Sequence, residues 1–260
     1  MSPTENKPGI LLTNDDGVDA EGLEVLRRAV SGLGEVTIVA PREHMSATSH
    51  SISLYQPVRY EKLGERRYAV HGTPVDSVIL ALNKILPHPP ALVISGINQG
   101  GNLGQNVFYS GTVGAAVEGT FHGIPSVAIS LAALRGASFD AAGAFAKLLV
   151  PAVLRHGLPE NVTLNINVPY GRSHRGARIT HRAHRESRSY LLEPENSQHR
   201  GQGHWIRERI EMDKVGDGSD HAAIRQGYIS ITPLMLDGAS TPSLGEIERW
   251  ANTLGPLVVR

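Results

Sequence analysis

Short apolar stretches alternate along the chain with longer stretches in which apolar residues recur every three or four positions. The short stretches have the length of buried strands, and the longer ones have the spacing of amphipathic helices. Strands are predicted over 9–13, 36–40, 91–95, 127–131, 162–166 and 228–232. Helices are predicted over 20–33, 73–86, 111–123, 139–156 and 244–254. This regular alternation predicts an α/β fold, a doubly wound and mostly parallel sheet with helices on both faces.

Two regions depart from this alternation. Short β-like pieces around 52–55, 58–60 and 68–70 predict a hairpin between the second strand and the second helix. The stretch 169–220 is polar, rich in Arg and His, and predicts hairpins or an arm with a β-rich character. We therefore expect an α/β core over 1–168, an arm over 169–220, and a return strand with a C-terminal helix over 221–260.

Composition narrows the class of protein. The 260 residues are enough for a large core, and 25 basic residues balance 25 acidic ones, so no global charge favours nucleic acid or a membrane. The absence of cysteine excludes disulfides, thiolate nucleophiles and zinc–thiolate sites. No apolar run approaches the roughly 20 residues of a membrane span, and residues 1–8 show no signal peptide. A soluble, cytoplasmic enzyme is expected.

Two adjacent carboxylates, Asp15 and Asp16, follow the first predicted strand. Ligands of open α/β sheets bind at the carboxyl ends of the strands, and a divalent cation would offset the repulsion between neighbouring carboxylates. The alternative is that one of the two aspartates caps the helix that begins near Ala20.

Two further loops at predicted strand ends carry oxygen ligands. Ser46 lies in the loop after the second strand, and Asn98 follows the strand 91–95. With Asp15 and Asp16 they would form a partial shell of the kind that Mg²⁺ or Mn²⁺ binds. Alternatively, Ser46 bonds its own backbone and Asn98 is a turn residue in a left-handed conformation.

A glycine-rich run from Gly96 to Gly104 leads through Tyr109 and Ser110 into the helix that begins at Gly111. Free N–H groups and the helix dipole make such a helix start a cradle for anions, of which phosphate is the natural guest. An ordinary surface turn is the alternative. Beside a cation site, the cradle indicates a phosphate ester as substrate.

These segments resemble the signature blocks of the SurE family, the stationary-phase survival proteins. The blocks are ILLTNDDG at 10–17, GTPVD at 72–76, SGINQGGNLG at 95–104, YSGTVGAAVEG at 109–119 and GYISITPL at 227–234. The resemblance implies a Rossmann-like α/β core with a swapped C-terminal arm, assembled as a homodimer or homotetramer. It also implies a phosphatase that hydrolyses nucleoside 5′- and 3′-monophosphates, with short polyphosphate as a further substrate.

The resemblance carries the family's metal ligands onto Asp15, Asp16, Ser46 and Asn98, which would hold one Mg²⁺ or Mn²⁺ per subunit. One departure concerns the loop after Ser46. Family members show a pattern like SGxGxSIT, whereas this chain has Ala47 and Ser49 in place of the glycines. Because alanine and serine take positive φ less readily than glycine, we expect the loop to sit differently over the metal.

The expected mechanism is largely electrostatic. Asp15, Asp16 and Asn98 are the predicted catalytic residues, because they fix a cation that activates water for attack on phosphorus. The predicted phosphate-binding residues, which stabilise the equatorial oxygens, are Asn102, Ser110, Gly111 and Thr112. Direct attack by an aspartate is left open, and activated water is favoured.

Other enzyme and signalling classes fit the first strand less well. A dinucleotide-dependent oxidoreductase would carry G-x-G-x-x-G where this chain has Asn14, Asp15, Asp16 and Gly17. A receiver domain would need an Asp at the end of a middle strand, where this chain has Ser95 and Asn98, and would be about half as long.

Two alternatives concern the arm. An arginine series could bind nucleic acid: Arg172, Arg175, Arg178, Arg182, Arg185 and Arg188. Glutamates such as Glu186 and Glu208 dilute this charge, so a solvated or subunit-contacting arm is favoured and no specific nucleic-acid partner is expected. A histidine series could bind zinc, but its spacing is not that of a helical ligand pair: His174, His181, His184, His199 and His204.

Overall fold

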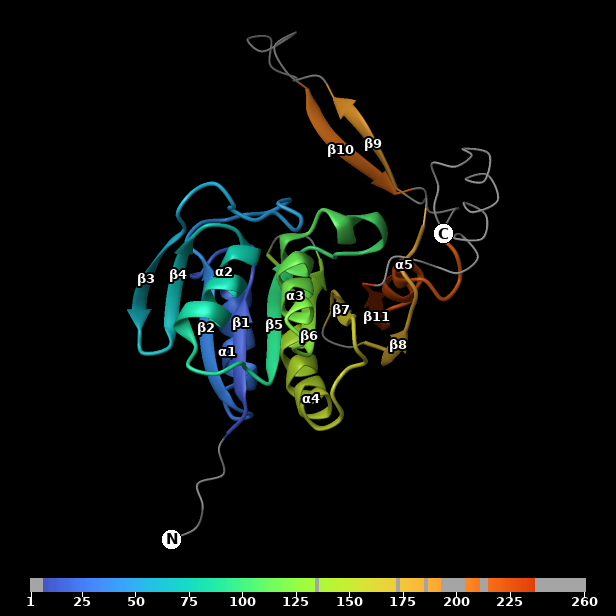
Figure 1. The fold of residues 1–260 in the computed structure, drawn as a ribbon. Coiled ribbons are helices and arrows are strands. Elements are labelled where there is room, and N and C mark those ends of the chain that lie inside the picture. The colour runs from blue at the N-terminus through green and yellow to red at the C-terminus, as the bar shows by residue number, and fades with distance from the viewer. Residues whose placement is uncertain are drawn as a thin grey trace, which may run out of the picture.

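The computed structural model describes residues 7–133, 136–171, 174–184, 187–192, 204–210 and 215–236. Within them, a nine-stranded sheet has the order β3-β4-β2-β1-β5-β6-β7-β11-β8 (Figure 1). Strands β4, β2, β1, β5, β6 and β7 run parallel, whereas β3 and β11 are antiparallel to their neighbours β4 and β7. The predicted doubly wound, mostly parallel α/β sheet is confirmed.

The first strands are β1 (Gly9–Thr13), β2 (Glu35–Pro41), β3 (Arg59–Gly64), β4 (Arg67–His71), β5 (Leu92–Gln99) and β6 (Ser126–Ala132). The later ones are β7 (Val162–Pro169), β8 (Ala177–Ile179), β9 (Ser187–Leu192), β10 (Trp205–Ile210) and β11 (Ile229–Met235). The helices are α1 (Glu21–Val30), α2 (Pro74–Leu80), α3 (Gly111–Phe121), α4 (Asp140–His156) and α5 (Asp220–Arg225). A π-helical turn (Ala81–Ile85) extends α2, and a 3₁₀ turn (Gly104–Phe108) precedes α3.

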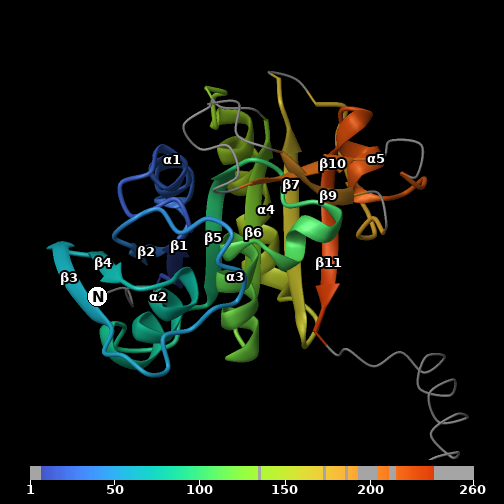
Figure 2. The same cartoon turned by 90° about the horizontal axis from the view of Figure 1, so that it is seen from above.

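The helices cover the sheet in two layers, with α1 and α4 on one face and α2 and α3 on the other (Figure 2). The alternation of side chains along β1 explains both layers. Ile10 and Leu12 join the core cluster that includes α1 and α4, while Leu11 joins the cluster on the α2 face. The helix start predicted at Thr73 is confirmed by a capping box, in which Thr73 Oγ1 accepts from Asp76 N and Asp76 Oδ2 accepts from Thr73 N.

One predicted β piece is wrong. Residues 52–55 form no strand, although β3 and β4 do form the predicted antiparallel hairpin. The Leu54 and Tyr55 side chains are exposed, and Ser53 donates its backbone N–H to Asp76 Oδ1 at 2.9 Å rather than to a neighbouring strand. Apolar content alone predicted this piece, but its described backbone and side-chain bonds run to the start of α2 instead of to a strand.

The stretch 169–220 departs from the βα pattern as expected, and its described parts include the antiparallel pair β9–β10, which extends away from the sheet (Figure 1). Two of its features were not predicted. Strand β8 returns to the main sheet beside β11, and Ser219 is the N-cap of α5, its Oγ accepting from Ala222 N. The predicted helix over 244–254 lies outside the described residues.

Candidate active site

The candidate site begins where β1 ends, because Asp15 and Asp16 follow this strand at the carboxyl edge of the parallel sheet. β5 lies beside β1 with Thr13 opposite Ser95, so Asn98, near the end of β5, lies at the same edge. The loop after β2 and the glycine-rich loop after β5 also lie along this edge (Figure 1). The structure therefore brings the predicted segments together at one end of the sheet.

Asp15 is buried, with 3% of its surface exposed. Thr112 Oγ1 donates to Asp15 Oδ1 at 2.5 Å, and the Thr112 N–H also bonds the carboxylate. Burial raises the pKa of Asp15 above its usual range, the hydrogen bond from the Thr112 side chain lowers it, and the charge of Asp16 raises it. Helix α1 has Ala20 at its N-cap and no side-chain cap, so Asp15 does not cap that helix.

Asp16 lies closer to solvent, with 18% of its side chain exposed. Burial raises the pKa of Asp16, while a hydrogen bond from the Gln99 backbone N–H and the nearby His44 both lower it. His44 Nδ1 lies 3.3 Å from Asp16 Oδ1. Sequence reasoning missed both contacts, and only the position of Gln99 next to Asn98 could have indicated one of them.

Ser46 lies in a loop that we call the serine loop, residues Met45–Ser51. The loop is joined to the aspartates through its first residue, since Met45 N donates to the Asp15 carbonyl at 2.7 Å. Thr48, rather than Ser46, makes a local bond to the backbone, from its Oγ1 to Met45 O at 2.8 Å. The Ser46 residue itself is exposed.

The serine loop takes left-handed backbone angles at both positions where the family pattern has glycine. The φ angle is 59° at Ala47 and 55° at Ser49. Both residues therefore take positive φ although they favour it less than glycine, and the expected difference in how the loop sits over a metal stays a prediction. Because the loop keeps this conformation without glycine, other contacts must offset its strain.

Asn98 lies within β5, which extends four residues past the predicted end of the strand. The register of β5 against β6 shifts between Gly96 and Asn98, so the strand bulges where Asn98 emerges. The Asn98 Nδ2 donates to Gly100 O at 2.8 Å, which leaves Oδ1 as the atom of this side chain that could bind a cation. Asn98 is not among the residues with positive φ, so it is not the left-handed turn residue of the alternative.

The start of α3 is buried beside Asp15. Ser110 is the N-cap, and its Oγ accepts from Val113 N at 3.1 Å. Gly111 packs so closely that a Cβ there would lie 3.0 Å from Asp15 Cβ and 2.8 Å from Thr48 Oγ1. The helix start thus lies against both the aspartate and the serine loop.

Asn102 occupies a separate network over β6 and β7. Its Nδ2 donates to Ser130 Oγ, its backbone N–H donates to Asn167 Oδ1, and its carbonyl accepts from Asn165 and Asn167. These bonds fix the backbone of the glycine-rich loop. The predicted contact of Asn102 with phosphate stays a prediction.

A buried carboxylate that sequence reasoning missed also holds this loop. Asp220 Oδ2 accepts from Gly104 N at 2.8 Å, and Oδ1 accepts from Ala183 N and His221 N. Asp220 therefore ties the arm and α5 to the loop that leads into α3. The Gly218-Ser219-Asp220 run, with its helix-capping residues, was the signal in the sequence.

The donor set of the site fits a hard divalent cation. Asp15 and Asp16 place two carboxylates side by side, and burial disfavours their charged forms when no cation is near. Among the described residues, no three His, Asp or Glu side chains group so as to hold a metal ion. Further ligands would therefore be neutral oxygens, of the kind that the Asn98 amide and the Ser46 hydroxyl could offer.

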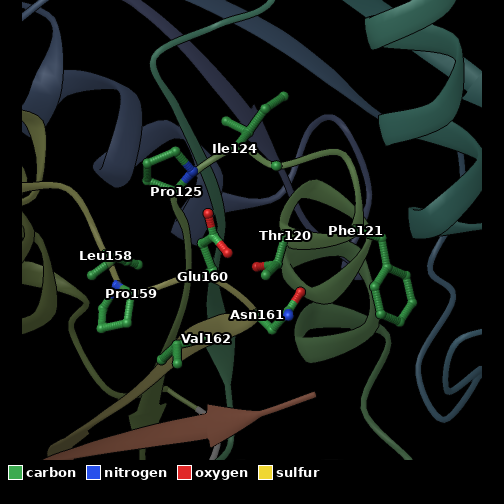
Figure 3. A pocket seen from close by; sticks show the side chains of 10 residues that line it. Thr120, Phe121, Ile124, Pro125, Leu158, Pro159, Glu160, Asn161 and Val162 are labelled. Carbon is green, nitrogen blue, oxygen red and sulfur yellow. The ribbon is translucent and has the colours of Figure 1, made fainter. Parts of the chain in front are cut away.

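In the described part of the arm, two arginines of the series considered for nucleic acid lie against aromatic rings, and the cavity in Figure 3 lies elsewhere on the sheet. Arg178 and Arg182 lie over the rings of Tyr228 and Phe108, at 3.6 Å and 4.6 Å from the centroids. The cavity is lined by residues such as Pro125 and Asn161, which lie at the amino ends of β6 and β7 (Figure 3). It therefore lies at the end of the sheet opposite the aspartates.

The fold and the site define an α/β protein with a paired-carboxylate centre beside a helix N-terminus. The family model described as "Survival protein SurE" matches residues 10–189. The "5'-nucleotidase SurE" of Aeromonas hydrophila is 42% identical over 255 residues, covering 95% of this chain and 99% of that protein. The protein of the same description from Myxococcus xanthus is 42% identical over 250 residues, covering 94% of each.

A solved structure agrees. The SurE protein from Aquifex aeolicus superposes with a TM-score of 0.85 at 35% sequence identity, covering 94% of this chain and 100% of that one. The chain belongs to the SurE family. Within the described residues, none of the helices combines the length and apolar character needed to cross a membrane.

Proposed function

We propose that this chain is a divalent-metal-dependent phosphomonoesterase that hydrolyses nucleoside 5′- and 3′-monophosphates to nucleoside and phosphate. The observation that carries the proposal is the contact between Asp15 and Thr112, which joins the carboxylate pair to the start of α3. Cation ligands and phosphate donors thereby share one edge of the sheet. The relatives described as 5'-nucleotidase support the choice of a nucleotide as substrate.

Four side chains would hold the cation: Asp15, Asp16, Asn98 and Ser46. When bound, a divalent ion supplies positive charge that polarises a phosphoryl oxygen and lowers the pKa of water. Asp15 is held in place by Thr112, so one ligand is oriented before the ion binds. Asp16 is oriented by the Gln99 backbone N–H and by His44.

The start of α3 would bind the phosphate. Ser110 accepts from Val113 N, so its own hydroxyl proton stays available to a phosphate oxygen. The Gly111 N–H, in the first turn of the helix, is the second donor we assign. We assign Thr112 mainly to holding Asp15, since both its side-chain hydroxyl and its N–H bond that carboxylate. In the reaction a water oxygen bonds to phosphorus, the P–O ester bond breaks, and the nucleoside oxygen takes up a proton.

A phosphate-release assay tests this function. The metal-stripped protein is offered adenosine 5′- and 3′-monophosphate and short polyphosphate, with and without Mn²⁺ or Mg²⁺. Metal-dependent release from the mononucleotides is expected, and polyphosphate is expected to be a further substrate. Hydrolysis that persists in the stripped protein with excess chelator would overturn the metal-dependent mechanism.

We also propose that the chain assembles as a homodimer or homotetramer through the arm. The β9–β10 hairpin extends from the sheet, and Leu191, Trp205 and Ile206 are each at least 60% exposed. Apolar surface of this kind is typical of an interface. Light scattering on Ile206→Lys should show a smaller particle than the parent chain, and an unchanged mass would exclude the hairpin as the contact.

A further inference from the structure

The serine loop is strained where it presents Ser46. Ala47 and Ser49 both adopt left-handed φ angles, a conformation in which the Cβ of an L-residue crowds the backbone. The third described non-glycine residue with positive φ is Asn161, a residue type that tolerates this region. A loop with two such residues close together would relax unless its surroundings held it.

The middle of the serine loop is held by hydrogen bonds to the residues that precede α3. Ser49 N donates to Tyr109 O at 3.0 Å, and Ser49 Oγ donates to Phe108 O at 2.6 Å. One turn into the helix, Gly114 leaves room for the loop backbone, since a Cβ there would lie 2.6 Å from Ser49 O. These contacts fix the start of α3 and the loop as one packed unit.

A hydrogen bond to a carboxylate holds the end of the loop. His50 Nε2 lies 2.8 Å from Glu118 Oε2, and His122 Nε2 lies 3.2 Å from the other carboxylate oxygen. Only 11% of the Glu118 side chain is exposed, and the hydrogen bond from His50 is the main reason that the pKa of Glu118 is lowered. The His50 ring also packs against Phe121, with centroids 5.4 Å apart. Glu118 is therefore a buried acceptor that two histidines share, and only His50 belongs to the loop.

We propose that His50 and Glu118 form a clamp that holds the serine loop in its left-handed conformation, which makes them positioning residues for Ser46. The proposal rests on the proposed function only in that Ser46 is taken as a cation ligand. His122 is the matched control, because it bonds the same carboxylate but lies on α3 and not on the loop.

The first test needs no metal and no substrate. Hydrogen exchange at the Ser49 amide, which is bonded to Tyr109 O, reports whether the loop is held. His50→Ala should speed this exchange by about tenfold, the effect of losing one hydrogen bond to a charged group. His122→Ala should change it by less than about twofold. Equal exchange in His50→Ala and the parent chain would overturn the clamp.

The second test measures the consequence for the site. Calorimetric binding of Mn²⁺ should weaken by about 10-fold in His50→Ala, as expected for residues that orient a ligand from behind it. Glu118→Ala should weaken binding equally, and the double variant should be no worse than either single one. His50→Gln, at a partly exposed position, serves if Glu118→Ala fails to fold.

A rescue variant separates positioning from general damage. Ala47→Gly removes the Cβ that strains the loop, so it should restore most of the exchange protection and Mn²⁺ affinity lost in His50→Ala. No restoration would overturn the link between strain and clamp. A parent chain that binds Mn²⁺ but releases no phosphate would refute the proposed function alone, because neither readout depends on turnover.

Discussion

Two loops at the same edge of the sheet meet a similar backbone demand with different residues. The glycine-rich loop has positive φ at Gly96, Gly100 and Gly104, whereas the serine loop has positive φ at Ala47 and Ser49. At Gly96 the choice is forced, since a Cβ would lie 2.3 Å from Ile129 O. At Ala47 the residue is exposed and has room. Crowding therefore requires glycine, while strain alone can be offset by contacts from outside the loop.

The largest effect is expected at the crowded glycine. Gly96→Ala should destabilise the fold by about 3 kcal/mol, because overpacking against Ile129 adds to the left-handed strain. Denaturant unfolding measures the loss. A change below about 1 kcal/mol would show that the two loops do not differ in crowding.

Removing the charge of Asp15 should separate activity from stability. Asp15→Asn should lower kcat/KM by more than about 100-fold, because the loss of a ligand exceeds that of a residue behind one. Burial raises the pKa of Asp15 in the folded state. When the pH lies above this raised pKa, the carboxylate is charged in its buried position and destabilises the metal-free fold. Metal-free Asp15→Asn should therefore have the higher Tm, and its advantage should shrink as the pH falls through the raised pKa.

The control for Asp15→Asn is Asp19→Asn, at a side chain that is 71% exposed. It should change neither kcat/KM nor the Tm of the metal-free protein appreciably. A lower Tm in metal-free Asp15→Asn than in the parent chain would contradict the account of a buried, cation-dependent charge.

A smaller loss is expected at the residue that joins α3 to the aspartate. Thr112→Val keeps the shape of the side chain but removes the hydroxyl that donates to Asp15. kcat/KM should fall by about 10- to 100-fold, with a matching loss of Mn²⁺ affinity. Thr112→Ser keeps the hydroxyl and should recover most of the activity, so equal losses in both variants would refute this role.

The smallest pair of effects compares the loops directly. Ala47→Gly should stabilise the fold by up to about 1 kcal/mol, since it relieves a left-handed L-residue. Gly100→Ala should change the stability in the opposite direction, with about 1 to 2 kcal/mol of destabilisation. Its surroundings leave space for a Cβ, so the cost comes from the positive φ angle alone. Thermal unfolding of the two variants would contradict this comparison if both changes had the same sign.

The sequence predicted the sheet because its buried strands are nearly continuous apolar runs and its helices have clear periodicity. It predicted the helix start at Thr73 because capping chemistry is local. It failed at 52–55, where apolar residues lie exposed, because pairing depends on which sheet edge is near. Local sequence patterns therefore predict the elements of the fold, but not which segments pair at a sheet edge.

The candidate site shows the same division. Asp15, Asp16 and Asn98 could be placed because topology brings strand ends together. Three contacts could not be placed, since each joins segments far apart in the chain: Thr112 with Asp15, His44 beside Asp16, and the hydrogen bond from His50 to Glu118. The left-handed backbone of Ala47 could not be predicted either, because residue type gives only a preference for φ, which the packed surroundings override.

In the proposed function, a divalent cation held by Asp15 and its neighbours enables hydrolysis of a nucleotide. Its most direct test is phosphate release from adenosine 5′-monophosphate by the metal-stripped chain during titration with Mn²⁺. No release is expected before the titration, with saturable activity during it and no response in Asp15→Asn. The same titration curve in Asp15→Asn and the parent chain would contradict it.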